Sequence, residues 1–530
     1  MREDAFGSTA SSLSAERPDI RKRKLYLVKV QLCAFMVYIS YIMVYSSRNL
    51  LNGIIIARQS PIAKCFTVVF IILPITLVMS ILVRKWLSRY SIQIMLTYAL
   101  AIFCLYFLIV NPFVVYFKQM LDFNDLLIVD FVADGKIAFK RMRLFAIFLS
   151  MLTSWTITLQ FSVINIYEAF VQYVLMFSMF NEIFTQKQYN GFVSIILFCE
   201  TLALLTSSLI SILHQQIITS VSYCNKEYVN VVFTNVIFAL NFVLFLIFVH
   251  LKTEVTKEKA ASVQRATIEL HANTPESEYD SARDKDLGSL LRLKFVRAIS
   301  VNVIALFILN EFMYISFESG VYTVAKKTFR HVTSTVIRST DIIRFASSLL
   351  ILVALFFSVP RRLIQHNWKF LAYSPCTWLI IASIFQFTMD TILKGVEGDS
   401  FQFVNNLFQS LSSSDNVHIR VWIYRIYNNF TILALIFVRI LRNIGFLIAK
   451  ETLTMMIDRK IRPRLRTIYD GMCPLIGKAI ASSVVLFMSE LFDFRDARSF
   501  SVVMLIFALV VFCSWINNTR YLVRRYYGAF

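Results

Sequence analysis

Two arginines, Arg439 and Arg442, stand three residues apart in an apolar stretch near residues 422–452. At this spacing on a helix, both side chains lie on one face. Two guanidinium groups on one face bind an oxyanion through paired hydrogen bonds, and phosphate is the natural match. The alternative is that each Arg pairs with a Glu as a structural strut. The spacing therefore predicts either a phosphate site or buried ion pairs.

Further ionisable residues stand within or at the ends of other apolar stretches. Such residues are expensive inside a membrane, so they are first interpreted as functional. They are Arg48, Glu168, Glu200, Glu318, Asp390, Lys450, Glu451, Asp470 and Lys478. A residue near the end of a stretch, such as Arg48, can instead extend its side chain to the membrane interface. For Glu200, the alternative is a buried carboxyl group hydrogen-bonded to neighbouring Ser or Thr.

Cysteine and histidine give no sign of a metal centre. The eight Cys include no Cys-x-x-Cys pair, and the six His stand singly. Structural metal sites usually bring such ligands together at short spacings. We therefore expect neither a metal nor another cofactor, and we interpret the Cys as small buried apolar residues.

The elements that position these charges are long apolar helices. Of the 530 residues, 57% are hydrophobic and only 16% are charged, which excludes a water-soluble enzyme, a disordered chain and a secreted disulfide scaffold. A membrane-spanning helix needs about 20 apolar residues. Suitable runs fall at about 28–50, 64–84, 92–117, 155–185, 191–215, 229–251, 296–322, 338–358, 370–392, 422–452, 467–490 and 499–518.

The twelve runs form two sets of six, which predicts an all-α polytopic membrane protein built from two six-helix halves. The predicted divisions are a flexible cytoplasmic N-terminus at 1–27, a half at 28–251, a cytoplasmic linker at 252–295, a half at 296–518 and a cytoplasmic tail at 519–530. The segment at about 139–153 is basic and then apolar, so we expect an interfacial helix leading into the fourth span.

Basic residues indicate the orientation. The 54 Lys and Arg exceed the 33 Asp and Glu, a formal net charge of +21. Lys and Arg concentrate in cytoplasmic loops of membrane proteins. With both termini cytoplasmic, the strong basic clusters all fall on the cytoplasmic side: 21–24, 84–89, the start of the central linker, 361–362, 459–466 and 520–525.

This pattern is typical of transporters of the major facilitator type, which consist of nested three-helix repeats with a site at the midplane between the halves. In that fold the first helix of each repeat, in spans 1, 4, 7 and 10, lines the cavity. Arg48, Glu168, Glu318 and the Arg439–Arg442 pair fall on those four spans.

The stretch FLIAKETLTMMIDRKIRPRLRTIYDGMCPLIGK, at 446–478, resembles a motif of the non-mitochondrial ATP/ADP translocases of plastids and intracellular parasites. On this resemblance, Lys450 and Glu451 match the family's Lys-Glu pair, and Asp458 matches its Asp. Arg462, Arg464 and Arg466 replace its spaced Lys residues, and Asp470, Gly477 and Lys478 match in register.

The first half is similar to the same family at Arg48–Asn49, where the family has Lys-Asp, and at the block that begins with Glu168. Glu318 aligns with the Glu of its Val-Glu-Val-Val-Trp-Lys block. Glu200 stands where the family usually has Gly. The many replacements make the chain most similar to the microsporidian members.

The resemblance implies a nucleotide carrier, not an enzyme, that imports ATP in exchange for ADP and phosphate. ATP and ADP would be its substrates, and the lipid bilayer its surroundings; we expect a monomer without nucleic-acid partners. Phosphate-binding roles fall to Arg48, Arg439, Arg442 and Lys450. Charge-pairing or gating roles fall to Glu168, Glu318, Asp470 and Lys478. The adenine site is unassigned, with Tyr38, Tyr41 and Tyr322 as possible stacking residues.

Several alternatives stay open at this stage. The carrier can instead move another anion, such as GTP or NAD, or couple uptake to protons. A receptor or channel with about seven spans, and a membrane enzyme, are less favoured. Because the N-terminal residues lack a transit signal, we expect the plasma membrane of an intracellular parasite, with a mitosome or plastid membrane as the alternative.

Overall fold

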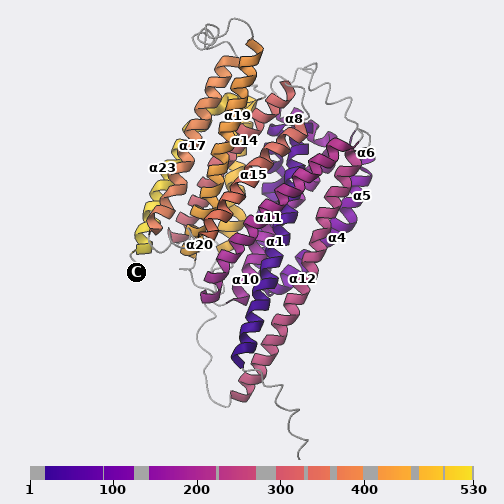
Figure 1. The fold of residues 1–530 in the computed structure, drawn as a ribbon, viewed down its shortest axis with the longest axis vertical. Coiled ribbons are helices and arrows are strands. Elements are labelled where there is room, and N and C mark those ends of the chain that lie inside the picture. Colours follow the sequence, from indigo (N-terminus) through magenta and orange to yellow (C-terminus); the bar gives the residue numbers. More distant parts are fainter. Residues whose placement is uncertain are drawn as a thin grey trace, which may run out of the picture.

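The computed structural model is all-helical (Figure 1). It describes residues 18–87, 89–123, 143–184, 186–221, 226–269, 294–327, 332–357, 367–397, 416–454, 465–492 and 496–527. Twelve helical segments in these ranges are long and apolar enough to cross a membrane. Each coincides with one of the twelve predicted apolar runs, so the predicted twelve-span fold is confirmed.

The first half contains six spans. They are α1 (Pro18–Arg58); α2, η1 and α3 (Pro61–Thr67, Val68–Ile72, Leu73–Leu87); α4, η2 and α5 (Ile92–Leu105, Tyr106–Val110, Asn111–Tyr116); α9, η3 and α10 (Trp155–Tyr167, Glu168–Met176, Phe177–Ile183); α11 (Gln186–Ser220); and α12 (Lys226–Glu269). Short α6 (Lys118–Leu121) follows span 3. Helix α8 (Arg143–Thr153) precedes span 4, where an additional helix is expected from the sequence.

The second half contains the other six. They are α14 (Lys294–Lys327); α15 (Val332–Phe356); α17 (Trp368–Glu397); α19, η6 and α20 (Asn416–Ile440, Leu441–Phe446, Leu447–Thr454); η7 and α22 (Thr467–Met472, Cys473–Phe492); and η8 with α23 (Ala497–Phe500, Ser501–Tyr527). Several helices extend beyond the predicted spans; α1 begins at Pro18 and ends at Arg58, α12 continues to Glu269 and α23 to Tyr527. Arg361, Arg362, Asp458, Arg462 and Arg464 lie outside the described residues.

Successive spans run in opposite directions, so twelve crossings return the chain to the end of the bundle where it began. Figure 1 shows the start of α1 and the C-terminus at the same end. We call this the termini end, and the opposite end, where α1 turns into α2, the far end. These two names locate the charged residues along the bundle.

The turn between α1 and α2 is tight. Ser60 has a φ of 101°, a left-handed conformation that is uncommon for a residue other than Gly. Its hydroxyl group accepts a hydrogen bond from the Ala63 backbone N–H at 3.3 Å, and Pro61 supplies the first helical position. Ser as a cap and Pro at the first position both favour a helix start. This turn positions Lys64 one turn into α2.

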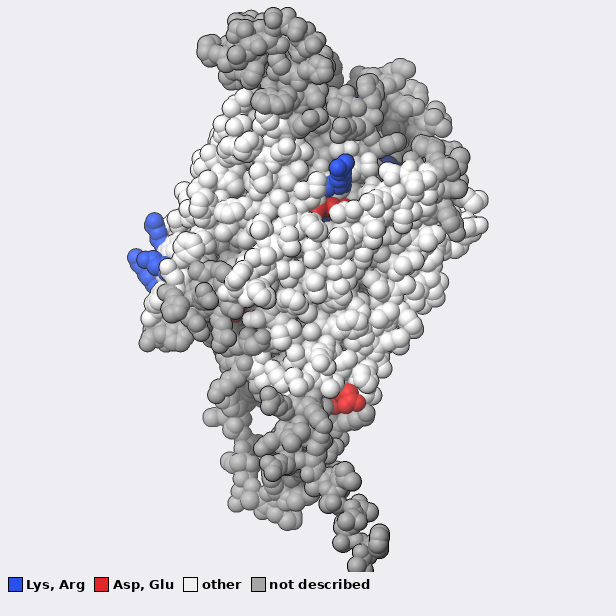
Figure 2. Space-filling model, in the orientation of Figure 1, with Lys and Arg blue, Asp and Glu red and all other residues white. Residues whose placement is uncertain are grey.

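Each half has its own apolar core. One large cluster of buried side chains draws on spans 1 to 6, and a second draws mostly on spans 7 to 12. The two halves pack together where α15 contacts α1 and α11. The outer surface is apolar: Figure 2 shows a broad face on which charged side chains are sparse. Such a surface suits contact with lipid chains.

Candidate functional site

A central pocket lies between the two halves. Its lining comes from spans 1, 4, 7 and 10, as predicted for a fold of this type, and also from spans 2, 5, 8 and 11; within the described residues, spans 3, 6, 9 and 12 contribute nothing. Eight Lys and Arg and six Asp and Glu line it, an excess of two cations. A pocket of this composition favours an anionic ligand.

Three of the pocket helices change locally from α- to π-helical turns beside the charged residues. The turn η3 begins at Glu168, η6 contains Arg442, and η7 contains Asp470. A π-helical turn inserts an extra residue into the helix and commonly occurs at functional sites. In these three helices the extra residue changes the direction of the side chains that follow it. This helps to direct charged residues toward the pocket.

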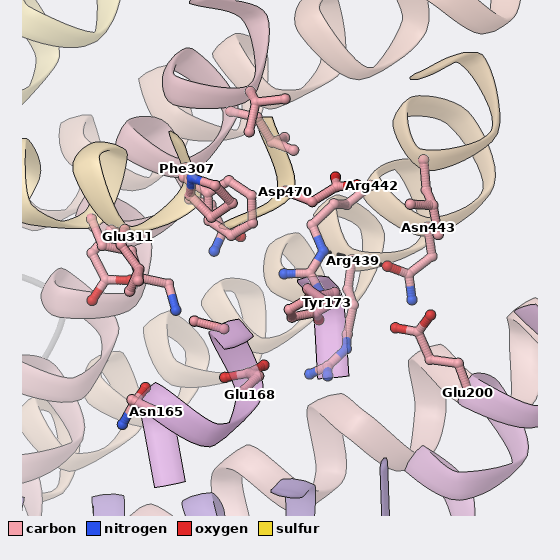
Figure 3. Close-up of a pocket in the computed structure, with 18 of the residues that line it drawn as sticks. Asn165, Glu168, Tyr173, Glu200, Phe307, Glu311, Arg439, Arg442, Asn443 and Asp470 are labelled. Atoms are coloured by element: carbon pink, nitrogen blue, oxygen red, sulfur yellow. Dashed lines mark hydrogen bonds between the residues drawn. The ribbon is translucent and has the colours of Figure 1, made fainter. Parts of the chain in front are cut away.

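Arg439, Arg442 and Lys478 line the pocket without a carboxylate partner. In the part of the chain that the structure describes, none of the three has a carboxylate oxygen within 4.0 Å. Arg439 is 6% exposed and its Nε has no hydrogen-bond partner, whereas the Arg442 Nε donates to Asn443 Oδ1 at 3.3 Å. Figure 3 shows both guanidinium groups pointing into the pocket beside Tyr173. The strut alternative therefore has no support.

Arg48 forms an ion pair with Glu168 across the first half. The Arg48 Nη1 donates to Glu168 Oε2, and the Glu168 side chain is 10% exposed. Arg48 also lies over the ring of Tyr45, 5.7 Å from its centroid. Arg48 therefore faces the pocket rather than the membrane interface, the alternative considered for it from the sequence.

Lys64 and Glu318 connect the two halves toward the far end. The Lys64 Nζ lies 2.7 Å from both carboxylate oxygens of Glu318, and Asn52 Nδ2 donates to Oε1 at 2.8 Å. Lys64 belongs to α2 in the first half and Glu318 to α14 in the second. Glu318 thus pairs with a lysine that the sequence analysis did not consider.

Lys450 takes part in a cluster of charges toward the termini end. Its Nζ donates to Asp470 and lies 3.3 Å from Glu451 Oε1. Glu451 in turn accepts a hydrogen bond from Arg466 Nη2 at 2.6 Å, and the Arg466 side chain is only 1% exposed. All four residues belong to the second half. Lys450 is therefore already neutralised, in contrast to Arg439, Arg442 and Lys478.

A further polar link between the halves involves Asn49 and Asp341. Asn49 Nδ2 donates to Asp341 Oδ1 at 2.6 Å and to Ser211 Oγ at 3.3 Å. One turn along α15, the Arg344 Nη1 donates to the backbone oxygen of Tyr45 at 2.8 Å. Asp341 and Arg344 are both buried. The seam between α1 and α15 is thus held by polar as well as apolar contacts.

Comparison with known proteins decides the family. A family model described as the TLC ATP/ADP transporter matches residues 18–526, nearly the whole chain. The chain belongs to the TLC ATP/ADP transporter family. Its family consists of carriers, so this protein is a transporter and not an enzyme.

The relatives of this ATP/ADP transporter family member include microsporidian proteins. The chain is 24% identical to the ADP,ATP carrier protein 1 of Paranosema grylli over 493 residues, 92% of this chain and 86% of the relative. It is 24% identical to the ADP,ATP carrier protein 3 of Encephalitozoon cuniculi (strain GB-M1) over 492 residues, 91% of this chain and 86% of the relative.

Two solved transporter structures are similar in outline to this family member. The nucleoside transporter NupG has a TM-score of 0.46 at 12% identity, covering 93% of this chain and 98% of NupG. A bacterial homologue of the iron transporter ferroportin has a TM-score of 0.43 at 12% identity, covering 91% and 98%.

Two groups of residues singled out from the sequence lie away from the transporter's pocket. Asp390 is fully buried in α17 and accepts hydrogen bonds from Ser316 and Tyr427. Among the aromatic residues, Tyr41 lines the pocket, but Tyr38 hydrogen-bonds to Thr206 and Tyr322 packs against the core of the second half. Asp390, Tyr38 and Tyr322 therefore contact the surrounding protein rather than the pocket.

The sequence analysis missed several pocket residues of this transporter. Glu311, Asp341 and Arg344 lie inside predicted apolar runs, so the rule that marked Glu168, an ionisable residue within a span, marks them equally. Lys64 begins a predicted apolar run, at 64–84, and was not considered. Arg466 was grouped with the basic residues of 459–466, and no signal in the sequence distinguishes it from the others in that group. Of the missed residues, Glu311, Arg344, Lys64 and Arg466 line the pocket.

Proposed function

We propose that this protein imports ATP in exchange for ADP and phosphate by alternating access of the central pocket to the two sides of the membrane. ATP carries about four negative charges near neutral pH, and moving it past an apolar barrier requires compensating cations. Membership of the family indicates the class of substrate, and the excess of cations in the pocket suits an anion of that class.

The observation that carries this proposal is that four pocket cations have no carboxylate within ion-pair distance among the described residues. Arg344 donates instead to the Tyr45 backbone oxygen, which leaves Arg439, Arg442 and Lys478 for a ligand. A buried cation without a partner is costly, so such groups are retained where a ligand neutralises them. Arg439 and Arg442 present planar guanidinium groups suited to paired hydrogen bonds with phosphate oxygens. The sequence analysis gave Lys478 a charge-pairing or gating role, but its lack of a carboxylate within ion-pair distance among the described residues supports grouping it with the phosphate-binding residues.

The paired residues then act as reserves of charge. Arg48 is held by Glu168, and Lys450 is held by Asp470 and Glu451. When phosphate enters, either cation can exchange its carboxylate for the ligand, which lowers the cost of opening the pair. Glu318 serves as a gate through its contact with Lys64, because that contact joins the halves toward the far end.

The test of substrate binding is uptake of labelled ATP by vesicles that contain the purified protein. Arg442→Ala removes a charge-assisted hydrogen bond, so the apparent affinity for ATP falls roughly ten- to hundred-fold. Arg520→Ala is the matched control, because Arg520 is exposed on α23 and does not line the pocket. Full uptake by a correctly inserted Arg442→Ala protein contradicts the phosphate role.

Exchange is tested separately from binding. Vesicles loaded with ADP take up labelled ATP faster than empty vesicles if the carrier is an exchanger. Uptake into empty vesicles that depends on a proton gradient instead supports proton-coupled transport. A panel of competing GTP, NAD and phosphate then ranks the substrates by the concentration that halves ATP uptake.

Orientation and membrane follow from the same proposal. The basic clusters favour cytoplasmic termini, so a tag at either terminus should resist protease added outside intact cells. We place the carrier in the plasma membrane of an intracellular parasite, where import of host ATP is useful. Immunogold labelling that concentrates on a mitosome or plastid instead contradicts this placement.

A further inference from the structure

Beside the charged cluster of Lys450 toward the termini end, the pocket also has a wall that differs from its cationic centre. This wall is lined by aromatic and apolar side chains that include Tyr41, Tyr173, Phe177, Leu197 and Phe446. The rings of Tyr173 and Phe177 are nearly parallel, with an interplanar angle of 15° and centroids 6.4 Å apart. An aromatic wall of this kind suits the face of a planar heterocycle.

Glu200 places a carboxylate in this wall. Its side chain comes from α11, the residue is 5% exposed, and Tyr45 Oη donates to its Oε1 at 2.9 Å. Within the described residues, no Lys or Arg lies within ion-pair distance of it. An ionised carboxylate only accepts hydrogen bonds. The other oxygen, Oε2, is therefore suited to an N–H donor supplied from the pocket.

Asn443 places a donor opposite this acceptor. The residue is 2% exposed, its Oδ1 is used by Arg442, and its Nδ2 has no hydrogen-bond partner among the described residues. Figure 3 shows the Asn443 amide and the Glu200 carboxylate pointing toward one another, and no hydrogen bond joins them. Buried donors are nearly always satisfied, so an unpaired one calls for an explanation.

One donor and one acceptor facing the same space match the hydrogen-bonding edge of adenine, which offers the N6 amino group as donor and N1 as acceptor. Enzymes that read a base outside a duplex combine such edge contacts with stacking on aromatic side chains. Asn443 and Glu200 line the same pocket as Arg439 and Arg442, so one nucleotide could contact the arginines with its phosphates and this edge with its base.

We propose that Glu200 and Asn443 form the base subsite of the carrier. Glu200 accepts a hydrogen bond from the adenine amino group, Asn443 donates to N1, and the ring lies against Tyr173 or Phe177. This subsite rests on the proposed nucleotide transport and adds residues that determine base specificity. The competing explanation is that Glu200 only balances the charge of Arg439 and Arg442.

Competition with analogues separates these two explanations. Purine riboside triphosphate lacks the amino group of ATP, and 1-deaza-ATP lacks N1; tripolyphosphate has no base. Against labelled ATP uptake by the normal protein, each analogue should compete roughly ten- to hundred-fold less well than ATP, as expected for loss of a hydrogen bond to a charged or buried group. Equal competition by ATP and both analogues overturns the subsite.

Each variant should lose discrimination for its own analogue alone. In Glu200→Ala, ATP and purine riboside triphosphate become nearly equal, while 1-deaza-ATP still competes poorly; Asn443→Ala shows the reverse. If Glu200 only balances charge, Glu200→Ala strengthens competition by tripolyphosphate and all nucleotides alike and leaves their ratios unchanged, which rejects the subsite. Glu200→Gln, which keeps an acceptor oxygen and the side-chain shape, should retain part of the discrimination.

The outcomes for the two proposals are distinct. If the normal protein takes up no labelled nucleotide, nucleotide transport is wrong, and the base subsite is wrong with it. If it transports ATP but the ratios do not change in either variant, only the subsite is wrong. If a variant fails to insert, the competition ratios of the analogues, measured with the normal protein and with Glu200→Gln, decide the question without it.

Discussion

Loss of Lys64 should release the two halves at the far end of the bundle. Lys64 in α2 and Glu318 in α14 form an ion pair at 2.7 Å, and the Glu318 side chain is only 4% exposed. In Lys64→Met, the Glu318 carboxylate stays buried, with Asn52 as its remaining side-chain hydrogen-bond donor among the described residues. The contact between halves is then lost, and the carboxylate gains by reaching water.

The size of the effect follows from the burial of the pair. Removing one partner of a buried ion pair costs about 3–5 kcal/mol, whereas replacing both partners by neutral groups of similar volume is often nearly neutral. About 1.4 kcal/mol corresponds to a factor of ten. In Lys64→Met, the ratio of molecules whose halves are in contact at the far end to molecules whose halves are apart there should therefore fall by roughly a hundred- to several-thousand-fold. Lys64→Met with Glu318→Gln should recover most of this loss.

Cys65 provides the reporter, because it follows Lys64 directly and is 1% exposed. In a protein whose other cysteines are replaced by serine, a water-soluble maleimide should label Cys65 slowly. Lys64→Met should raise the labelling rate and lower the melting temperature, and the double variant should return both toward the starting values. Unchanged labelling in Lys64→Met, or a double variant as labile as the single one, refutes the role of this pair.

Three further predictions concern charge and packing. Glu168→Gln leaves the half-buried Arg48 without its carboxylate, so the melting temperature should fall while competition by tripolyphosphate strengthens; a fall in both contradicts the charge-reserve role. Lys478→Met should weaken competition by tripolyphosphate roughly ten-fold or more, measured against ATP uptake, and an unchanged value excludes it from the phosphate group. A Cβ at Gly477 would lie 2.7 Å from a backbone oxygen of α14, so Gly477→Ala should destabilise by about 1–3 kcal/mol. Gly471→Ala, whose Cβ would meet a methyl group at 3.0 Å, should cost less in the same thermal unfolding assay.

The sequence predicted the twelve spans well because their signal is local. Each needs only a run of apolar residues long enough to cross a bilayer, and this property is independent of the other spans. The same reasoning identified Arg439 and Arg442 as neighbours on one face, since their spacing lies within a single helix. Segment boundaries differed where helices continue into polar sequence, as α12 does up to Glu269.

Pairing between spans was much harder to predict. Glu318 was expected to balance the pocket arginines, but it contacts Lys64, 254 residues away in the chain. Such a partner depends on how α2 lies against α14, and the residue types within each span do not predict that arrangement. The π-helical turns at Glu168 and Arg442 were also beyond reach, because they depend on packing between helices rather than on the local residues.

Glycine is scarce in this chain, at 12 of 530 residues. In the structure, several glycines lie where two helices approach each other closely. A Cβ at Gly53 would lie 2.6 Å from Ile337 of α15, and one at Gly445 would lie 2.8 Å from Pro375 of α17. Small residues at crossings allow helices in a membrane to approach without a hydrophobic driving force. Because Gly53 lies on the seam between the halves, close packing there constrains the interface across which the proposed alternating access would occur.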